Sequence, residues 1–290
     1  MLNPTVVVFP YGEINISSQL LLYKTHLNHT YIVTEETPFH PVSHIWPDHP
    51  ADRGELIIDE QIFTVTDCVV GAIDRTGELF IGADIPVKRE EAGWQFVVVH
   101  QIDALIELRP SQTVMLRVDK DYQDSLSRAH SGAHLAALAL NKVLHQDYWR
   151  KQPDRNDELG HHHFHRYAEE TSFVSPDTCI DTYRLGKTLR KRGLNSDDVV
   201  TNLTVIEALV NQQLAIWLVT QAEIKMVCKG PYLTDSRYWT INLDATEICM
   251  PCGGTHINSL AQLISLTVQL KLDQAGQIIM TTQTKATKAA

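Results

Sequence analysis

Two short stretches of the chain carry residues that could bind one metal ion together. His130 and His134 stand four positions apart, so on a helix both imidazoles project from the same face, one turn apart. About 120 residues later comes Cys252-Gly253-Gly254-Thr255-His256, where two adjacent glycines let the backbone turn sharply so that a thiolate and an imidazole converge. Three imidazoles and one thiolate form a ligand set that suits zinc best.

Each half alone has a simpler interpretation. Histidines at i and i+4 occur by chance on many helices, and a free cysteine is commonly a buried small hydrophobe. Cys249-Met250-Pro251-Cys252 is also a C-x-x-C, so a structural zinc knuckle, or Cys249 as ligand in place of Cys252, stays open. Together and in this order, the two halves are more specific than either one.

His-x-x-x-His followed far downstream by Cys-Gly-Gly-Thr-His resembles the editing domain of alanyl-tRNA synthetase and the freestanding alanyl-tRNA editing (AlaX-type) proteins. Threonyl-tRNA synthetase has a related domain, but the sequence Gly253-Gly254-Thr255 resembles that of the alanyl branch. Other stretches between about residues 30 and 270 resemble the family in the same order: Thr37-Pro38-Phe39-His40-Pro41, Pro50-Ala51-Asp52-Arg53-Gly54, Val118-Asp119, Ser127-Arg128, and 203–220 with Ile206-Glu207-Ala208-Leu209-Val210-Asn211.

The resemblance implies a zinc-dependent hydrolase that removes serine or glycine from mischarged alanine tRNA, with His130, His134, Cys252 and His256 as the metal ligands. A protein-bound zinc ion can polarise a carbonyl or lower the pKa of bound water towards about 7, and the bond between amino acid and ribose is an ester. Four protein ligands would close a tetrahedral site, whereas a catalytic zinc keeps one position open. Either one ligand, with His256 as the first candidate, is loosely held, or the metal mainly orients the substrate.

The pocket residues depart from the family pattern. The helix reads His-Ser-Gly-Ala-His where the family often has His-Thr-Ala-Thr-His, so Ser131 keeps one hydroxyl and Ala133 lacks the other. His44-Ile45-Trp46-Pro47 or His49-Pro50 stands in place of the family's Gly-Gly-Gln-Pro, and no Gln-x-Gly-Ser occurs within residues 150 to 180. Hydrolysis of another aminoacyl ester, or of a small ester or amide, is therefore a rival hypothesis.

Two further hypotheses lie outside this class. A full synthetase is not expected, because 290 residues leave no room for a class II aminoacylation core beside an editing domain. A non-catalytic tRNA-binding module that zinc stabilises stays open, since a fold does not imply a function.

Length and composition bound the class of protein. The chain is long enough for two modest domains, each with its own core. Met1–Pro10 lacks the basic start of a secretory signal, no run of eighteen apolar residues occurs, and the five cysteines are too scattered for a disulfide framework. We therefore expect a cytoplasmic protein that contacts no membrane. The net charge of −10 argues against wrapping long nucleic acid but allows contact with the acceptor end of tRNA.

Two clusters of charged or titratable residues have open interpretations. The basic cluster before Gly193 is either a solvated helix face or a phosphate-contacting patch for the tRNA acceptor end. His161-His162-His163-Phe164-His165 invites a second-metal interpretation, but we expect an exposed or strand-borne polar run and assign it no ligand role. The basic cluster consists of Arg184, Lys187, Arg190, Lys191 and Arg192.

The elements that would position these residues predict an α+β protein of two domains. Residues 1–110 predict a small β-barrel, a domain that the freestanding editing proteins carry, and residues 111–290 predict an α+β editing-type domain with helices packed on an antiparallel sheet. The predicted barrel strands are Thr5–Phe9, Thr30–Thr34, Glu55–Asp59, Ile62–Thr66, Cys68–Ile73, Glu78–Ile81 and Trp94–His100.

In the second predicted domain, a helix capped by Asp124 or Ser127 carries the paired histidines to about His145. A further helix spans about Val199–Trp217, after the capping residues Asn195-Ser196-Asp197-Asp198. Strands at Tyr238–Leu243 and Leu263–Leu272 enter and leave the Cys252 loop. The polar tail from Thr281 to Ala290 is expected to fray.

Overall fold

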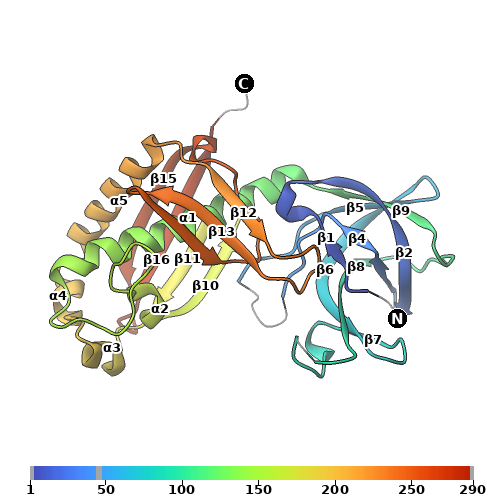
Figure 1. Ribbon diagram of the computed structural model, residues 1–290, viewed down its shortest axis with the longest axis horizontal. Coiled ribbons are helices and arrows are strands. Elements are labelled where there is room, and N and C mark those ends of the chain that lie inside the picture. Colours follow the sequence, from blue (N-terminus) through green and yellow to red (C-terminus); the bar gives the residue numbers. More distant parts are fainter. Residues whose placement is uncertain (1–2, 44–47, 90, 288–290) are drawn as a thin grey trace. The chain divides into compact units, whose positions relative to one another are not determined.

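The computed structural model describes residues 3–43, 48–89 and 91–287 and divides into two compact units (Figure 1). The first unit contains the chain up to Asp124, together with Met226–Arg237 and Cys252–Thr255. The second contains Ser125–Lys225, Tyr238–Pro251 and the chain from His256 onward. Antiparallel sheets in both units and helices in the second confirm the predicted α+β class.

The first unit is built on a sheet of seven strands in the order β5-β9-β2-β3-β8-β6-β7. An additional pairing joins β5 to β6, so the pairings lead from β5 through β9, β2, β3, β8 and β6 back to β5. β1 and β4 form a separate short parallel pair. The bounds are β1 Val6–Val7, β2 Asn15–His26, β3 His29–Thr34, β4 Glu36–Thr37, β5 Gly54–Ile58, β6 Gln61–Ile73, β7 Leu79–Ile81, β8 Gln95–Ile102 and β9 Thr113–Val118.

Most predicted strands of this unit are confirmed, with several differences. Ile62–Thr66 and Cys68–Ile73 belong to one strand, β6, whose register against β8 shifts between Val65 and Asp67. Thr5–Phe9 is a strand only at its centre. The twelve-residue β2 was not predicted, because many of its residues are exposed and polar and the alternating pattern is weak. β9 follows the boundary expected at residue 110 and pairs with β2 and β5.

Two of the family-like stretches meet inside the first unit. The buried Asp52 carboxylate accepts hydrogen bonds from the backbone N–H of His40 at 2.8 Å and from Gln123 Nε2 at 2.6 Å. Burial raises the pKa of Asp52 to about 7. A Cβ on Gly54 would lie 2.1 Å from the carbonyl oxygen of Arg117, so the chain needs glycine where it enters β5. His44-Ile45-Trp46-Pro47 lies outside the described residues.

The second unit packs helices on antiparallel strands. Its four-stranded sheet has the order β10-β11-β16-β15, and α1 lies across one face of it (Figure 1). A second sheet has the order β12-β13-β14. The bounds are α1 Lys120–Asp147, α2 Phe164–Ala168, β10 Glu169–Ser175, β11 Thr178–Tyr183, α3 Lys187–Arg192, α4 Ser196–Thr201, α5 Leu203–Val219, β12 Ile224–Cys228, β13 Arg237–Leu243, β14 Thr246–Pro251, β15 Leu263–Leu272 and β16 Ile278–Ala286.

The histidine helix α1 begins earlier than predicted. Asp119 Oδ1 accepts a hydrogen bond from the N–H of Tyr122 at 3.1 Å, which is the N-cap arrangement, whereas the predicted caps Asp124 and Ser127 lie inside the helix. An acid or serine in the first turns of a helix resembles a cap when only the sequence is read. In the second unit, Arg128 Nε donates a hydrogen bond to Asp177 Oδ1 at 2.6 Å, which connects α1 to the turn between β10 and β11.

Three further expectations for the second unit are wrong. The tail from Thr281 is not frayed up to Ala286, because it lies in β16 between β11 and β15, where buried Thr282 and Thr284 occupy core positions. The helix predicted at Val199–Trp217 breaks at Asn202 into α4 and α5. The histidine tract is neither exposed nor strand-borne, since His162 is buried and His163 caps α2.

Helix α5 protects the edge of the four-stranded sheet, where β15 is the last strand. The Asn211 side chain accepts a hydrogen bond from the N–H of Val268 at 2.7 Å and donates one to its carbonyl at 2.8 Å. The Glu207 carboxylate accepts one from the N–H of Leu270 at 2.7 Å. Open backbone groups at a sheet edge invite further strands, so these side chains block that pairing.

No helix among the described residues has both the length and the apolar composition needed to span a bilayer.

Gly132 lies between His130 and His134 on the side of α1 that packs against the sheet. A Cβ there would stand 2.7 Å from Thr284 Cγ2 and 3.1 Å from Leu266 Cδ1, and both residues are buried. Alanine normally stabilises a helix interior by about 1 kcal/mol relative to glycine. We expect Gly132→Ala to destabilise the protein by roughly 1–3 kcal/mol instead, because the helix must move off the sheet.

Urea unfolding measures this change. The control is Gly186→Ala, since a Cβ on Gly186 would meet nothing closer than 3.8 Å. Gly186 is the N-cap of α3, so this variant should lose only about 1 kcal/mol or less, the cost of alanine at a cap. A stabilised Gly132→Ala variant would contradict this prediction, because it would show that the methyl group fits between α1 and the sheet.

Candidate metal centre

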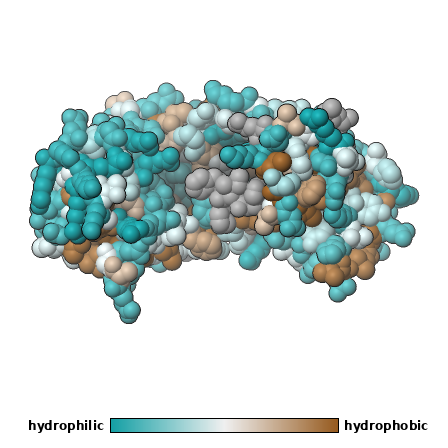
Figure 2. Space-filling view, turned by 90° about the horizontal axis from the view of Figure 1, so that it is seen from below, coloured by the Kyte–Doolittle hydropathy of each residue, from teal (hydrophilic) through white to brown (hydrophobic). Residues whose placement is uncertain are grey.

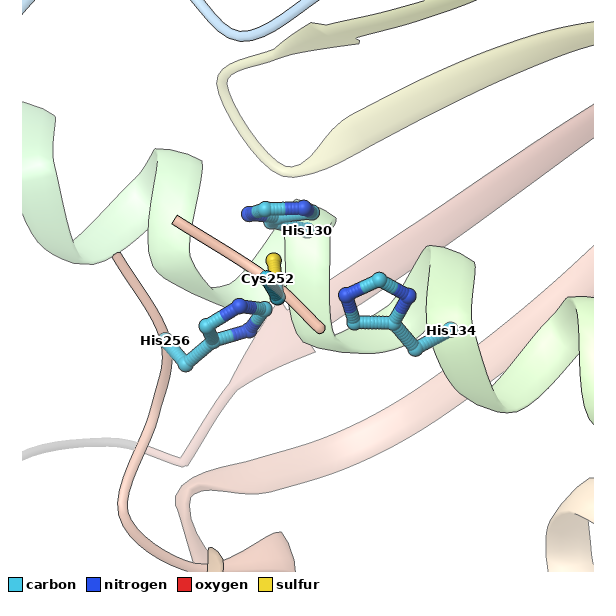
Figure 3. Close-up of side chains that lie close together, drawn as sticks. All are labelled: His130, His134, Cys252 and His256. Carbon is cyan, nitrogen blue, oxygen red and sulfur yellow. The ribbon is translucent and has the colours of Figure 1, made fainter. Parts of the chain in front are cut away.

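The side chains of His130, His134, Cys252 and His256 point towards a common centre (Figure 3). One ligand atom of each lies within 4.8 Å of the others. Ligand atoms around a tetrahedral zinc ion are about 3.3–3.7 Å apart, given Zn–N and Zn–S bonds of about 2.0–2.3 Å. The four residues therefore fit a metal ion of this kind after small side-chain movements.

Two elements bring the histidines together. His130 and His134 lie one turn apart on α1, with ring centroids 4.8 Å apart, as the spacing predicts. The ring of His256 stacks on that of His130 at 4.2 Å and lies 5.1 Å from that of His134. The sequence thus identified residues that the fold gathers, although they are more than a hundred positions apart.

The loop that carries Cys252 follows β14 directly. The N–H of Cys252 donates to the carbonyl of Arg237 at 3.0 Å, which holds the start of the loop. Gly253 and Gly254 do not adopt a positive φ, so the turn does not use the left-handed conformations that glycine allows. Cys249 is exposed on β14 and is not part of the gathered group.

Burial sets the protonation of two of these side chains. Burial, with a smaller contribution from His165, lowers the pKa of His134 to about 3, so the imidazole is neutral near pH 7, as a metal ligand must be. Burial raises the pKa of the Cys252 thiol to about 11, and Asp48 adds to this effect. A cation favours the thiolate, so metal binding near neutral pH would release the thiol proton.

Ser131 connects α1 to the residue at the far end of the loop. Its hydroxyl lies 3.0 Å from His256 Nδ1 and accepts a hydrogen bond from the N–H of Ile257 at 3.2 Å. For His256 to bind a metal through Nε2, its Nδ1 must carry the proton and donate it to Ser131 Oγ. In that tautomer the oxygen, which has two lone pairs, would accept both hydrogen bonds. His256 is therefore held in place, which argues against the loosely held ligand considered from the sequence.

Sequence reasoning missed two neighbours of the group. The Trp239 ring, fully buried on β13, lies 5.1 Å from that of His134 and 6.1 Å from that of His256, so it forms an apolar wall. His165 is near enough to influence His134, and its Nδ1 lies 3.0 Å from the hydroxyl of Tyr183. The sequence around Trp239 does not indicate that its ring lies beside the histidines, because this depends on the position of β13 in the fold.

The other histidines of the tract serve local structure. The N–H of His162 donates to Nδ1 of His145 at 3.1 Å, and His162 Nδ1 lies 3.2 Å from Asn156 Oδ1. The side chain of His163 accepts from the N–H of Arg166. These contacts order the segment that leads into α2.

The predicted basic cluster lies on and beside α3, and acids oppose its arginines. Arg184 pairs with Glu170 at 3.1 Å and Arg192 with Asp154 at 2.6 Å. A third pair joins Arg190 to Asp197 at 3.7 Å. Lys187 and Lys191 are exposed, and the surface over α3 and α4 is mostly hydrophilic (Figure 2). The net positive charge of this cluster is thus smaller than its sequence indicates.

An open hollow of about 840 Å³ lies beside the basic cluster. It combines acidic and basic side chains from the end of α2, the start of β10 and the segment that forms α3. Its lining residues are Tyr167, Ala168, Glu169, Glu170, Arg184, Leu185, Gly186, Lys187, Thr188, Leu189 and Arg190.

Comparison with curated proteins adds to this geometry. The chain is 22% identical over 249 residues to the alanine–tRNA ligase of Lactobacillus acidophilus. The chain is a distant relative of that ligase. The match covers 84% of this chain but 23% of the ligase, so the chain spans less than a quarter of the ligase's length. No family model matches the chain.

Replacing Ser131 by alanine removes the oxygen that holds His256 and Ile257. We expect Ser131→Ala to weaken zinc binding by about 10–100-fold, the usual effect of losing the group that orients a ligand histidine. Competition with a chromophoric chelator measures the affinity. The control is Ser127→Ala, a buried serine on the same helix with the same loss of a hydroxyl. Equal zinc affinities in the two variants would contradict the proposed orientation of His256.

Proposed function

We propose that this chain is a zinc-dependent hydrolase that deacylates mischarged aminoacyl-tRNA, with Ser- or Gly-loaded alanine tRNA as substrate. The observation that carries the proposal is the convergence of His130, His134, Cys252 and His256 within 4.8 Å. The distant relation to an alanine–tRNA ligase supports tRNA as the partner. The order and the residue sequence of the two motifs support the editing reaction over aminoacylation.

The proposal assigns each nearby residue a task. His130, His134 and Cys252 would hold the metal, while Ser131 keeps His256 in the tautomer whose Nε2 is free to bind. When bound there, zinc would polarise the ester carbonyl or make a water molecule a better nucleophile. Trp239 limits the entry of bulk water next to His134 and His256. Ala133 offers no hydroxyl towards a substrate, so recognition of serine would rely on other groups.

The two-domain organisation belongs to the same proposal. The circular series of pairings from β5 back to β5 supports a small N-terminal β-barrel, whose strand β9 extends past the expected boundary at residue 110. The proposal retains a barrel domain at 1–110 and an editing-type domain at 111–290. We further propose that the tRNA acceptor end contacts Lys187 and Lys191, the exposed lysines of the basic cluster, and less strongly the acid-paired Arg184, Arg190 and Arg192.

One observation favours a second candidate function. Four protein ligands around a metal close a tetrahedral site, and closed sites are typical of structural zinc. A non-catalytic tRNA-binding module that zinc stabilises would use the same four residues. Hydrolysis of another aminoacyl, small ester or amide substrate would also retain the metal centre while changing the pocket.

The deciding experiment is a deacylation panel of Ser-, Gly- and Ala-charged alanine tRNA, with and without a zinc chelator. We expect hydrolysis of the Ser- or Gly-charged tRNA, sparing of the Ala-charged tRNA, and loss of activity with chelator that added zinc restores. His130→Ala and Cys252→Ala should lose both bound zinc and at least about a hundredfold in rate, because each removes a metal ligand.

The controls are His26→Ala and Cys249→Ala, which remove an exposed histidine and an exposed cysteine outside the group. Both should keep zinc and activity. A zinc-free variant with full activity would exclude the metal-dependent mechanism. Bound zinc with no hydrolysis of any charged tRNA, and unfolding on chelation, would favour the binding module.

Charge reversal tests the basic cluster separately. Lys187→Glu with Lys191→Glu should raise KM for charged tRNA about tenfold or more and leave kcat little changed, because the lysines would contact phosphates away from the reacting ester. The salt dependence of KM should also become less steep. The control is Lys88→Glu with Lys271→Glu, which reverses two other exposed lysines. An equal rise of KM in both double variants would indicate only the effect of net charge.

A further inference from the structure

Helix α5 is apolar on both of its faces. Ile206, Val210, Leu214 and Trp217 are buried towards the body of the second unit. On the opposite face, Val205 is 54% exposed, Leu209 43%, Ile216 54% and Val219 83%. A row of exposed apolar side chains on a helix surface is suited to a partner.

The outer residues follow the spacing of a helix pair. Val205, Leu209, Gln212, Ile216 and Val219 stand at intervals of four, three, four and three residues, the repeat that keeps a seam towards a second helix. Ala208 and Ala215 flank the seam, seven residues apart, and are small enough for close approach of two backbones. Gln212 is the single polar residue of the seam and lies near its middle.

The charge distribution indicates what the partner is. Residues 203–219 contain one charged residue, Glu207, whose carboxylate is engaged by the N–H of Leu270. With a net charge of −10, two copies of this chain repel each other across most surfaces. The uncharged face of α5 is a place where two copies can approach without opposing like charges, and interface centres are depleted in charge in the same way.

We propose that two copies of this chain dimerise by antiparallel packing of their α5 helices, about a two-fold axis near Gln212. Val205 of one copy then packs against the Ile216–Val219 end of the other, and the reverse contact forms by symmetry. The two Gln212 amides lie near the axis, where they can hydrogen-bond to each other and set the register. The same apolar surface is used twice, so no other partner is required.

The size of the face sets the strength of this dimer. A helix of 17 residues is about 25 Å long, and two such helices packed along one side bury a few hundred Å² per copy. Stable dimers bury about 800 Å² per partner. The dimer is therefore weak and dissociates on dilution.

Sedimentation velocity on the full chain, from about 1 µM to several hundred µM, tests the proposal. The average mass should rise from one copy towards two. Ile216→Glu should shift the midpoint at least tenfold to higher concentration, because it places two like charges in the seam. Phe173→Glu, which changes a 55% exposed residue on β10, is the matched control and should dimerise normally. Circular dichroism checks that both variants fold.

Cysteine cross-linking tests the orientation. Gln212→Cys should give a covalent dimer on mild oxidation beyond that of the unmodified chain. Val205→Cys should not, because antiparallel packing puts the two copies of this residue about 20 Å apart. A chain that stays monomeric throughout, an Ile216→Glu variant that dimerises like Phe173→Glu, or efficient cross-linking of Val205→Cys would overturn the proposal.

Discussion

The close packing of α1 on the four-stranded sheet is the constraint on which the candidate metal centre depends. At Gly132 the helix lies so near the sheet that a single added carbon would touch Thr284 and Leu266. The residues on either side of this contact are the paired histidines. Their backbone positions are thus set by the core of the second unit, which gives the imidazoles the rigid mount that a metal site needs.

Ser131 and His130 connect α1 to His256, which ends the loop that begins at Cys252. Ser131 bonds to His256 and Ile257, and stacked histidine rings complete the connection. The buried thiol and imidazole prefer their neutral forms, so the group alone does not carry a stable negative charge. Any affinity of the group for a cation would come from its geometry and donor types, and the thiolate would form as the cation binds.

The sequence predicted that these four side chains would gather because donor spacing is local. The interval between His130 and His134 follows from helical periodicity, and Cys252 and His256 are close along the chain, so the only distant requirement was that the two pairs meet. The strands at Tyr238–Leu243 and Leu263–Leu272 were predicted for a similar reason, since each is a short run of β-branched and apolar residues.

Elements whose burial depends on distant partners were missed. β2 exposes many polar residues, and β16 buries threonines that read as a solvated tail until β11 and β15 are placed on either side. The histidine tract resembled a polar run because its partners Asn156 and His145 are not recognisable beforehand. Ser131 was noted for its hydroxyl, but its bond to His256 depends on a contact 125 positions away.

The side-chain hydrogen bonds from α5 to β15 affect how readily this sheet edge becomes open to aggregation. Side chains, not a neighbouring strand, satisfy the outer amides of Val268 and Leu270, and side chains withdraw more readily than a paired backbone. If this helix melts locally before the rest of the unit, an alternating apolar strand is left with an open edge, the template from which cross-β stacking grows. Storage lifetime would then be governed by fraying of one helix, well before global denaturation begins.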